Sequence, residues 1–125
     1  MYLNCHSYYS LRYGTLPIDK LVEMAVANGI DTLALTDINN SMGVVDFVRA
    51  CDKSGIKPIA GIEFRDGNEL LYIGIARNNE GFMELNEFLS YHNINKLPLP
   101  LQAPAFSHSI VIYPFGKKLS DNLRE

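Results

Sequence analysis

Three side chains that could bind a metal ion or transfer a proton follow or close short apolar segments of the chain. They are His6, Asp37 and Glu63. If these segments are neighbouring parallel strands, their carboxyl ends meet at one rim, where α/β proteins place their chemistry. A histidine and two carboxylates that converge there form a metal site or an acid–base constellation. The spacing alone leaves a second interpretation open, in which each side chain ends its own strand in solvent.

The segments that carry these side chains have the length and composition of strands, which are predicted at 2–5, 32–36 and 57–64. Between them, apolar residues at helical spacing predict two helices. Their apolar stripes are Ile18, Leu21, Val22 and Ala25 in the first, and Val44, Phe47, Val48 and Cys51 in the second. A βαβαβ order with short connections predicts right-handed crossovers. The predicted fold class is therefore α/β, with parallel strands and crossover helices.

Proline, glycine and small polar residues mark where the two helices begin and end. Pro17 fits the first turn of the first helix, and Gly29 fits the position just after its end. Asn40 or Ser41 is predicted to cap the second helix, and Gly55 is predicted to end it.

The second half of the chain predicts a different arrangement. The turn Asp66-Gly67 predicts a hairpin between the third strand and a fourth at 69–76. A third helix is predicted to open at 78–80, and its apolar stripe is Phe82, Leu85 and Leu89. Segment 97–104 has three prolines and is predicted to be extended. A last short strand is predicted at 109–113.

Composition limits the classes of function. The chain has 125 residues, 47% of them hydrophobic and 20% charged, as in one ordinary globular domain. Its formal net charge is −3 and its basic residues are scattered, so it has no basic surface that would grip DNA by itself. No apolar run reaches the roughly 18 residues of a membrane span. The two cysteines are far apart, which favours a reduced, cytoplasmic protein.

The remaining reactive or aromatic side chains have structural interpretations. Cys5 and Cys51 are predicted to be core residues. No functional role is predicted for His92 or His108. A group of tyrosines in one loop, Tyr8, Tyr9 and Tyr13, could line a pocket or pack against an adjoining domain, and packing is the favoured interpretation.

Several motifs occur in a familiar order along residues 1–90. They are His6-Ser7-x-Tyr9-Ser10-Leu11, Gly14, Leu21-Val22, Ala25, Gly29, Leu33-Ala34-Leu35-Thr36-Asp37, Gly55-Ile56-Lys57-Pro58-Ile59-x-Gly61-x-Glu63 and Glu80-Gly81-Phe82-x-x-Leu85. In this pattern the chain resembles the N-terminal PHP (polymerase and histidinol phosphatase) domains of bacterial DNA polymerase III alpha subunits. The blocks at 9–11 and 55–63 resemble this polymerase branch more closely than stand-alone PHP phosphoesterases.

The resemblance implies a distorted (β/α)7 barrel with a zinc or manganese site at the carboxyl ends of its strands. Carried over, the family's ligands fall on Asn4, His6, Asp37, Ile38 and Glu63. Asn4 and Ile38 stand where the family has histidines, so we expect a remnant site that holds no cofactor. Residues 1–125 would be the N-terminal portion of a longer, truncated PHP domain, with further ligands and polymerase domains downstream.

The resemblance also implies a function. The parent protein would be a DNA-directed DNA polymerase, a magnesium-dependent nucleotidyltransferase of DNA replication, and this portion would be structural and inactive alone. Its partners would be the polymerase body of the same chain and other replicase subunits, with DNA bound through the parent and no membrane. The alternatives are an active PHP metal-dependent phosphoesterase or 3′–5′ exonuclease, and an interaction module without inherited chemistry.

Two structural expectations follow. A carboxylate at Asp37 needs donors, and we expect them from the backbone of 38–41, from His6 or from Arg12. A barrel cut at residue 125 would leave unpaired strand edges, so we expect the chain to self-associate as a dimer.

Overall fold

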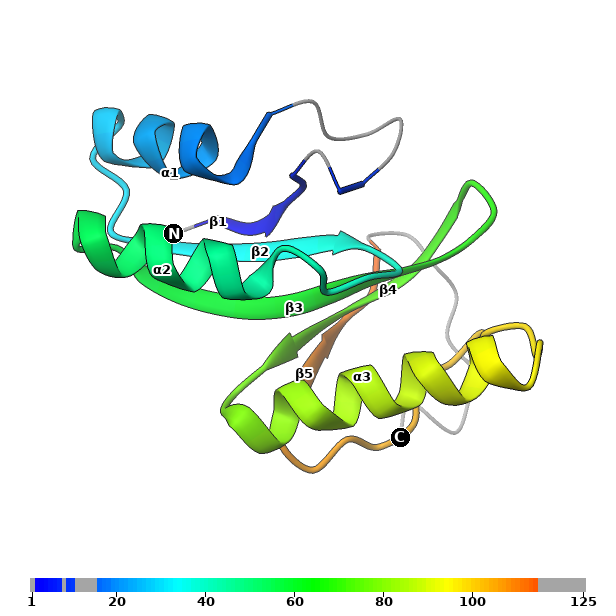
Figure 1. Ribbon diagram of the computed structural model, residues 1–125. Coiled ribbons are helices and arrows are strands. Elements are labelled where there is room, and N and C mark those ends of the chain that lie inside the picture. Colours follow the sequence, from blue (N-terminus) through cyan, green and yellow to red (C-terminus); the bar gives the residue numbers. More distant parts are fainter. Residues whose placement is uncertain (1, 8, 11–15, 115–125) are drawn as a thin grey trace.

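The computed structural model describes residues 2–7, 9–10 and 16–114 (Figure 1). Tyr8, Arg12, Tyr13, residues 115–125 and the side chain of Asn4 lie outside this description. The helices and strands follow in the order β1 (Tyr2–Cys5), α1 (Ile18–Ala27), β2 (Thr32–Ile38), α2 (Val44–Ser54), β3 (Lys57–Asp66), β4 (Glu69–Ala76), α3 (Asn79–Ile94) and β5 (Ser109–Ile112).

The described strands form one sheet whose order follows the sequence, from β1 to β5. β1, β2 and β3 are parallel, as the βαβαβ pattern predicted. β4 forms the predicted antiparallel hairpin with β3, and β5 pairs antiparallel with β4. The fold is therefore mixed α/β, with a parallel half and an antiparallel half. The described strands do not close into a barrel, so the (β/α)7 architecture remains an expectation from the resemblance.

The helices divide the hydrophobic core into two parts. α1 and α2 lie together over the parallel strands, and α3 packs against β3, β4 and β5 (Figure 1). The core under α1 and α2 includes Val22, Leu35, Phe47 and Cys51, and the core under α3 includes Phe64, Tyr72 and Leu85. A third cluster, Ala34, Ile73 and Ile75, gathers side chains of β2 and β4.

The predicted ends of the helices and strands agree with the structure except near the carboxyl ends of the parallel strands. Gly55 ends α2 in the left-handed conformation at φ 72°, and segment 97–104 is neither helix nor strand. The predicted cap of α2 is wrong, because the helix begins after Gly43 and that residue offers no side chain. A Cβ at Gly43 would lie 2.7 Å from Ile18 Cδ1, so a larger residue there would require the Ile18 side chain of α1 to move. Asn40 instead accepts a hydrogen bond from the Met42 N–H within the preceding turn.

The sequence-based assignments of the cysteines are confirmed in the core. Cys51 is fully buried under α1 and α2, and Cys5 is half-buried against the same cluster. Burial, with a smaller contribution from Asp52, raises the pKa of the Cys51 thiol to about 11. This thiol is therefore protonated at neutral pH. Within the described residues, none of the helices has the length and apolar character of a membrane span.

Candidate functional site

The carboxyl ends of the parallel strands hold a buried acidic side chain, Glu63, in contact with two basic ones. Glu63 lies on β3 and its side chain is 0% exposed. The Nε2 atom of His6, just after β1, lies 2.8 Å from Glu63 Oε1. Arg65 donates a hydrogen bond from Nε to the other carboxylate oxygen, Oε2. Since an ionised carboxylate only accepts hydrogen bonds, the imidazole of His6 is the donor in its contact. Both oxygens of Glu63 are thus engaged by protein groups.

The charge of Glu63 follows from this arrangement. Burial raises the pKa of the Glu63 carboxyl, but hydrogen bonds and charge from His6 and Arg65 outweigh burial and hold the pKa below its ordinary value. Glu63 is therefore ionised at neutral pH, and its negative charge is balanced by neighbouring side chains.

Asp37 is buried in a separate hydrogen-bonded group. Its side chain accepts three hydrogen bonds of 2.6 Å: from Ser7 N and Ser10 Oγ to Oδ1, and from Ser7 Oγ to Oδ2. The Ile38 N–H in turn donates to Ser10 Oγ at 2.8 Å. The expectation that Asp37 would be buried and hydrogen-bonded is confirmed. The donors described lie in the loop after β1, so the expectation of donors from 38–41 or His6 is wrong, while Arg12 lies outside the described residues.

The strand register explains why Asp37 and Glu63 lie apart. In the pairing of β2 with β3, Asp37 lies beside Ile62, and Ile38 lies beside Glu63. Successive residues of a strand point to opposite faces of the sheet. Glu63 therefore shares a face with Ile38, while Asp37 points to the face that carries Leu35. Of the three side chains expected to converge, the structure brings His6 and Glu63 into contact and places Asp37 on the other face.

These contacts leave little for a metal ion to bind. Both oxygens of Glu63 and both oxygens of Asp37 already accept protein hydrogen bonds. Ile38, the neighbour of Glu63 on its own face, has no donor atom. Across the described parts of the chain, no three His, Cys, Asp or Glu side chains are grouped to hold a metal. A catalytic zinc needs three protein ligands, so the side chains described on this rim do not fit one.

Three residues of the site were not singled out as donors from the sequence: Ser7, Ser10 and Arg65. Arg65 had a usable signal, because it lies two residues after Glu63 and residues two apart on a strand share a face. Ser7 and Ser10 had a weaker one. They lie in a loop, whose hydrogen bonds depend on its conformation and not on sequence spacing.

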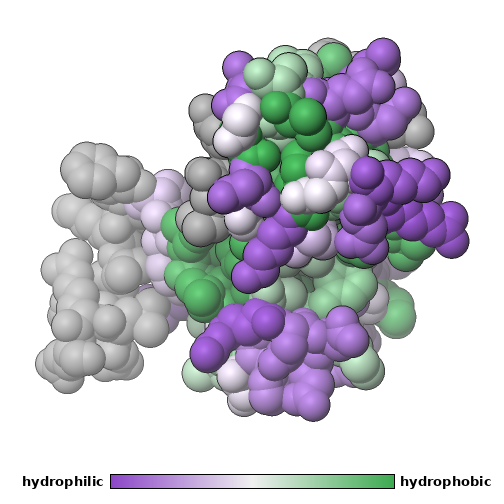
Figure 2. Space-filling view, turned by 90° about the vertical axis from the view of Figure 1, so that its left-hand side faces the viewer, coloured by the Kyte–Doolittle hydropathy of each residue, from purple (hydrophilic) through white to green (hydrophobic). Residues whose placement is uncertain are grey.

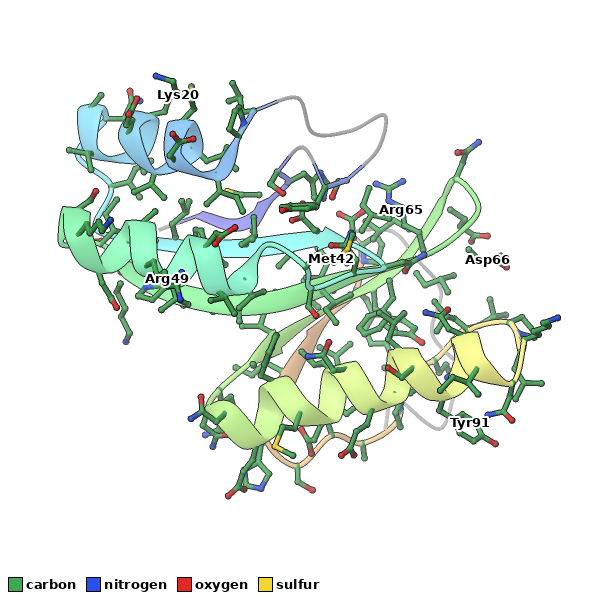
Figure 3. The ribbon with its side chains drawn as sticks, viewed as in Figure 1. Lys20, Met42, Arg49, Arg65, Asp66 and Tyr91 are labelled. Carbon is green, nitrogen blue, oxygen red and sulfur yellow. The ribbon has the colours of Figure 1, made fainter. Side chains whose placement is uncertain are left out.

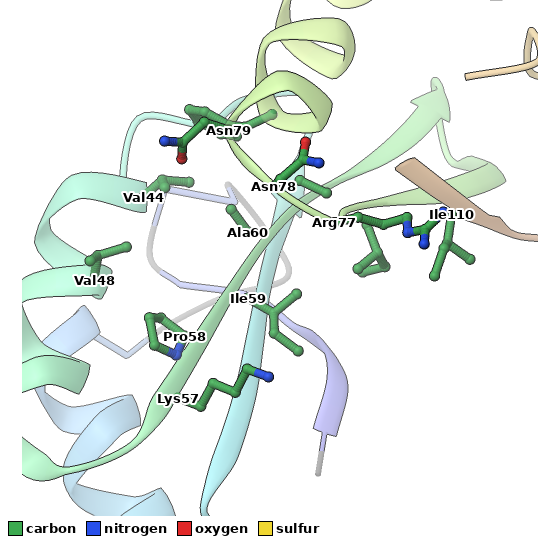
Figure 4. Close-up of a pocket in the computed structure, with 13 residues that line it drawn as sticks. Val44, Val48, Lys57, Pro58, Ile59, Ala60, Arg77, Asn78, Asn79 and Ile110 are labelled. Atoms are coloured by element: carbon green, nitrogen blue, oxygen red, sulfur yellow. The ribbon is translucent and has the colours of Figure 1, made fainter. Parts of the chain in front are cut away.

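One cavity lies away from this site, at the opposite end of β3. It has a volume of about 580 Å³ and lies between α2, the start of β3 and the start of α3 (Figure 4). Apolar side chains such as Val44, Pro58 and Ile75 line it, and Lys57 and Arg77 supply cationic groups. Its lining residues include no histidine, cysteine or carboxylate. It therefore offers no acid–base pair or metal ligand set.

The other two histidines have structural partners. His92 Nδ1 lies 2.8 Å from the carbonyl oxygen of Phe88 one turn earlier in α3. His108 Nε2 lies 2.8 Å from Glu80 Oε2 at the start of α3. Neither contact joins the His6–Glu63 pair.

Comparison with protein families identifies the class of this fold. The PHP domain model matches residues 3–112, and the chain belongs to the PHP domain family. Among solved structures, a protein of Bifidobacterium adolescentis described as a metal-dependent phosphoesterase has the same fold, with a TM-score of 0.58 and 22% identity. The match covers 75% of this chain and 32% of that one.

Curated relatives narrow the similarity to DNA polymerase III alpha subunits. DNA polymerase III subunit alpha of Ureaplasma parvum is 37% identical over 89 residues, which cover 71% of this chain and 9% of that protein. The same subunit of Staphylococcus aureus is 33% identical over 130 residues, which cover 99% of this chain and 12% of that protein. The chain thus spans about a tenth of the length of these relatives.

Proposed function

We propose that this chain is the N-terminal portion of the PHP domain of a DNA polymerase III alpha subunit, and that its role there is structural. The observation that carries the proposal is that every oxygen of its two buried carboxylates accepts a hydrogen bond from a protein group. Glu63 is held by His6 and Arg65, and Asp37 is held by Ser7 and Ser10. Carboxylates engaged in this way stabilise the rim, and they are not free to hold the ions that activate water in metal-dependent hydrolysis.

The activity of the parent protein belongs to parts outside this chain. We propose that the parent protein is a DNA-directed DNA polymerase that uses magnesium. It would bind DNA with its other domains and work in the cytoplasm. The similarity to DNA polymerase III alpha subunits supports this proposal. The PHP portion would pack against the polymerase body and other replicase subunits.

The rival function is metal-dependent hydrolysis of phosphoesters, as a phosphoesterase or 3′–5′ exonuclease. The contact between His6 and Glu63 favours it, because a histidine and a carboxylate are common ligands of catalytic metals. The contact of Arg65 with Glu63 opposes metal-dependent hydrolysis, because a guanidinium has no acceptor atom with which to ligate a cation.

A hydrolysis assay separates the two functions. We expect the purified chain to hydrolyse bis(4-nitrophenyl) phosphate and single-stranded DNA at the background rate, with zinc or manganese added at millimolar concentration. Without a bound metal there is no activated water, and the described site offers no other nucleophile with its base. The matched variant is Glu63→Gln. A wild-type rate above background that this variant loses would refute the structural role.

We also propose that the isolated chain self-associates as a dimer. Within the described residues, β1 and β5 each pair with one strand, so the sheet has two open edges. Large hydrophobic side chains are exposed as well, including Met24, Val26 and Ile110. The face turned to the left in Figure 1 shows hydrophobic residues between hydrophilic ones (Figure 2). Open edges and exposed apolar surface favour pairing with another chain.

Size-exclusion chromatography with light scattering tests this proposal at micromolar concentration. We expect a mass of twice the 14.0 kDa of one chain. A monomer at all concentrations would show that the sheet edges are protected within one chain.

A further inference from the structure

The buried carboxylate of Glu63 requires positive charge nearby. The side chain is 0% exposed and lies on the face of the sheet opposite to Ile62 and Phe64. Its neighbour on the same face, Ile38, supplies neither charge nor hydrogen bond. An ionised carboxylate in such surroundings is destabilising unless it is paired and hydrogen-bonded. The question is which group supplies the charge.

Arg65 is held so that it can supply this charge. Its side chain is 14% exposed, and its Nε donates to Glu63 Oε2. Its Nη1 also donates to the carbonyl oxygen of Asn68, at 3.1 Å, in the turn between β3 and β4. Figure 3 shows Arg65 at the carboxyl end of β3, near the hairpin. The guanidinium is therefore fixed at both of its ends.

The backbone of Arg65 is fixed as well. Its N–H donates to Asn39 Oδ1 and its carbonyl accepts from Asn39 Nδ2, both at 2.9 Å. At this point the strand pairing shifts, since Phe64 pairs with Tyr72 while Arg65 pairs with Leu70. One extra residue on β4 at such a shift re-aims the neighbouring side chains. The side chain of Arg65 is thus positioned by the hairpin, by the end of β2 and by Glu63.

We propose that Arg65 is the resident counter-ion of Glu63 and takes the place that a metal ion would have on this rim. The inference rests on the proposed structural function and deepens it. His6 donates to one oxygen of Glu63 and Arg65 to the other, so the carboxylate is neutralised by the chain itself. A metal ion that bound Glu63 Oε2 would have to displace the guanidinium from this carboxylate. The rim is therefore ordered without metal.

This network also joins three separate parts of the fold. His6 follows β1, Glu63 belongs to β3, and Arg65 is tied to the end of β2 through Asn39. Neutralisation of Glu63 by Arg65 therefore fixes the ends of the three parallel strands relative to one another. A loss of the arginine charge is expected to loosen all three ends.

Thermal unfolding of four variants tests the proposal. They are Arg65→Gln, Arg65→Lys, Glu63→Gln and the double variant Glu63→Gln/Arg65→Gln. The control is Arg49→Gln, because Arg49 is exposed on α2 (Figure 3). We expect Arg65→Gln to lower the unfolding midpoint by at least about 5 °C. Arg65→Lys should recover part of this loss, since it keeps the charge but not the planar fork. Arg49→Gln should leave the midpoint unchanged.

The double variant and added metal distinguish a counter-ion from a merely packed side chain. If Arg65 acts through the charge of Glu63, the double variant is no less stable than Glu63→Gln alone. Zinc or manganese should leave the wild-type midpoint equal to that in a chelator. Two results would overturn the proposal. One is a midpoint for Arg65→Gln equal to that of Arg49→Gln; the other is a wild-type gain on adding zinc that Glu63→Gln abolishes.

The outcome is separable from that of the proposed function. A chain whose midpoint rises with zinc through Glu63, but which hydrolyses nothing, contradicts only the counter-ion role of Arg65. Hydrolysis that depends on Glu63 contradicts the structural function itself. If Arg65→Gln does not fold, the Arg65→Lys variant and the wild-type metal titration still decide the question.

Discussion

Replacing Asp37 with alanine is expected to lower the free energy of unfolding by roughly 3–5 kcal/mol. Asp37 is 1% exposed and accepts three hydrogen bonds of 2.6 Å from Ser7 and Ser10. Alanine would leave these donors without an acceptor in a buried site. It would also release the loop after β1 from the end of β2. Urea-induced unfolding, followed by circular dichroism, measures the loss.

Two variants calibrate the effect of Asp37→Ala. Asp37→Asn keeps one acceptor oxygen but removes the charge, and we expect a loss between those of wild type and Asp37→Ala. Asp52→Ala removes an exposed aspartate from the last turn of α2 and should change stability by less than about 0.5 kcal/mol. Equal stabilities for Asp37→Ala and Asp52→Ala would mean that the serine hydrogen bonds add nothing to the fold.

The order of helices and strands could be predicted from local patterns. Apolar runs located the strands, helical spacing located the helices, and Gly55 ended α2 at φ 72° as expected. The cap of α2 could not be predicted in this way. Asn40 and Ser41 are good capping residues, but Asn40 accepts from Met42 within the preceding turn, and the Ser41 hydroxyl donates to Asn86 on α3. Tertiary contact overrides local preference at that position.

The candidate site shows which side-chain contacts can be predicted from the sequence and which cannot. That His6 and Glu63 meet follows from strand order, and their 2.8 Å contact agrees with it. The place of Asp37 follows from alternation along β2, since it shares a face with Leu35, which belongs to the core under α1 and α2. The partners of Asp37 lie in a loop, and loop conformation depends on contacts that no periodicity records.

The carboxylates of Asp37 and Glu63 are stabilised in the same way. Each is buried where strands end. Asp37 accepts from serine groups of the loop after β1, and Glu63 accepts from His6 after β1 and from Arg65 on its own strand. The hydrogen bonds of these polar side chains link the ends of β1, β2 and β3 to one another. Both carboxylates thus contribute to stability, provided that every donor and acceptor stays paired.

Replacing Phe64 with alanine is expected to destabilise the other half of the molecule by roughly 3–5 kcal/mol. Phe64 is fully buried under α3. Its ring centroid lies 5.4 Å from that of Tyr72 on β4 and 5.4 Å from that of Phe88 on α3, the second in an edge-to-face arrangement. Alanine would remove both contacts and leave a cavity between the sheet and the helix.

This loss should spread to the proline-containing segment after α3. The Tyr72 hydroxyl donates to the carbonyl oxygen of Pro100 at 2.9 Å, and Phe88 stacks edge-to-face against Phe106. Both rings adjoin Phe64, so a cavity there loosens the surface on which segment 100–106 rests. Hydrogen exchange of the backbone amides in this segment should become faster in Phe64→Ala.

Two further variants show whether the effect comes from the aromatic contacts. Phe64→Leu keeps most of the buried volume and should cost less than Phe64→Ala. Met83→Ala, on the exposed side of α3, should change the free energy of unfolding little, because Met83 is 58% exposed. Phe64→Ala and Met83→Ala could instead unfold at the same urea concentration. The stability of α3 and the hairpin would then not depend on the aromatic cluster, and the two parts of the core would unfold less cooperatively than their contacts indicate.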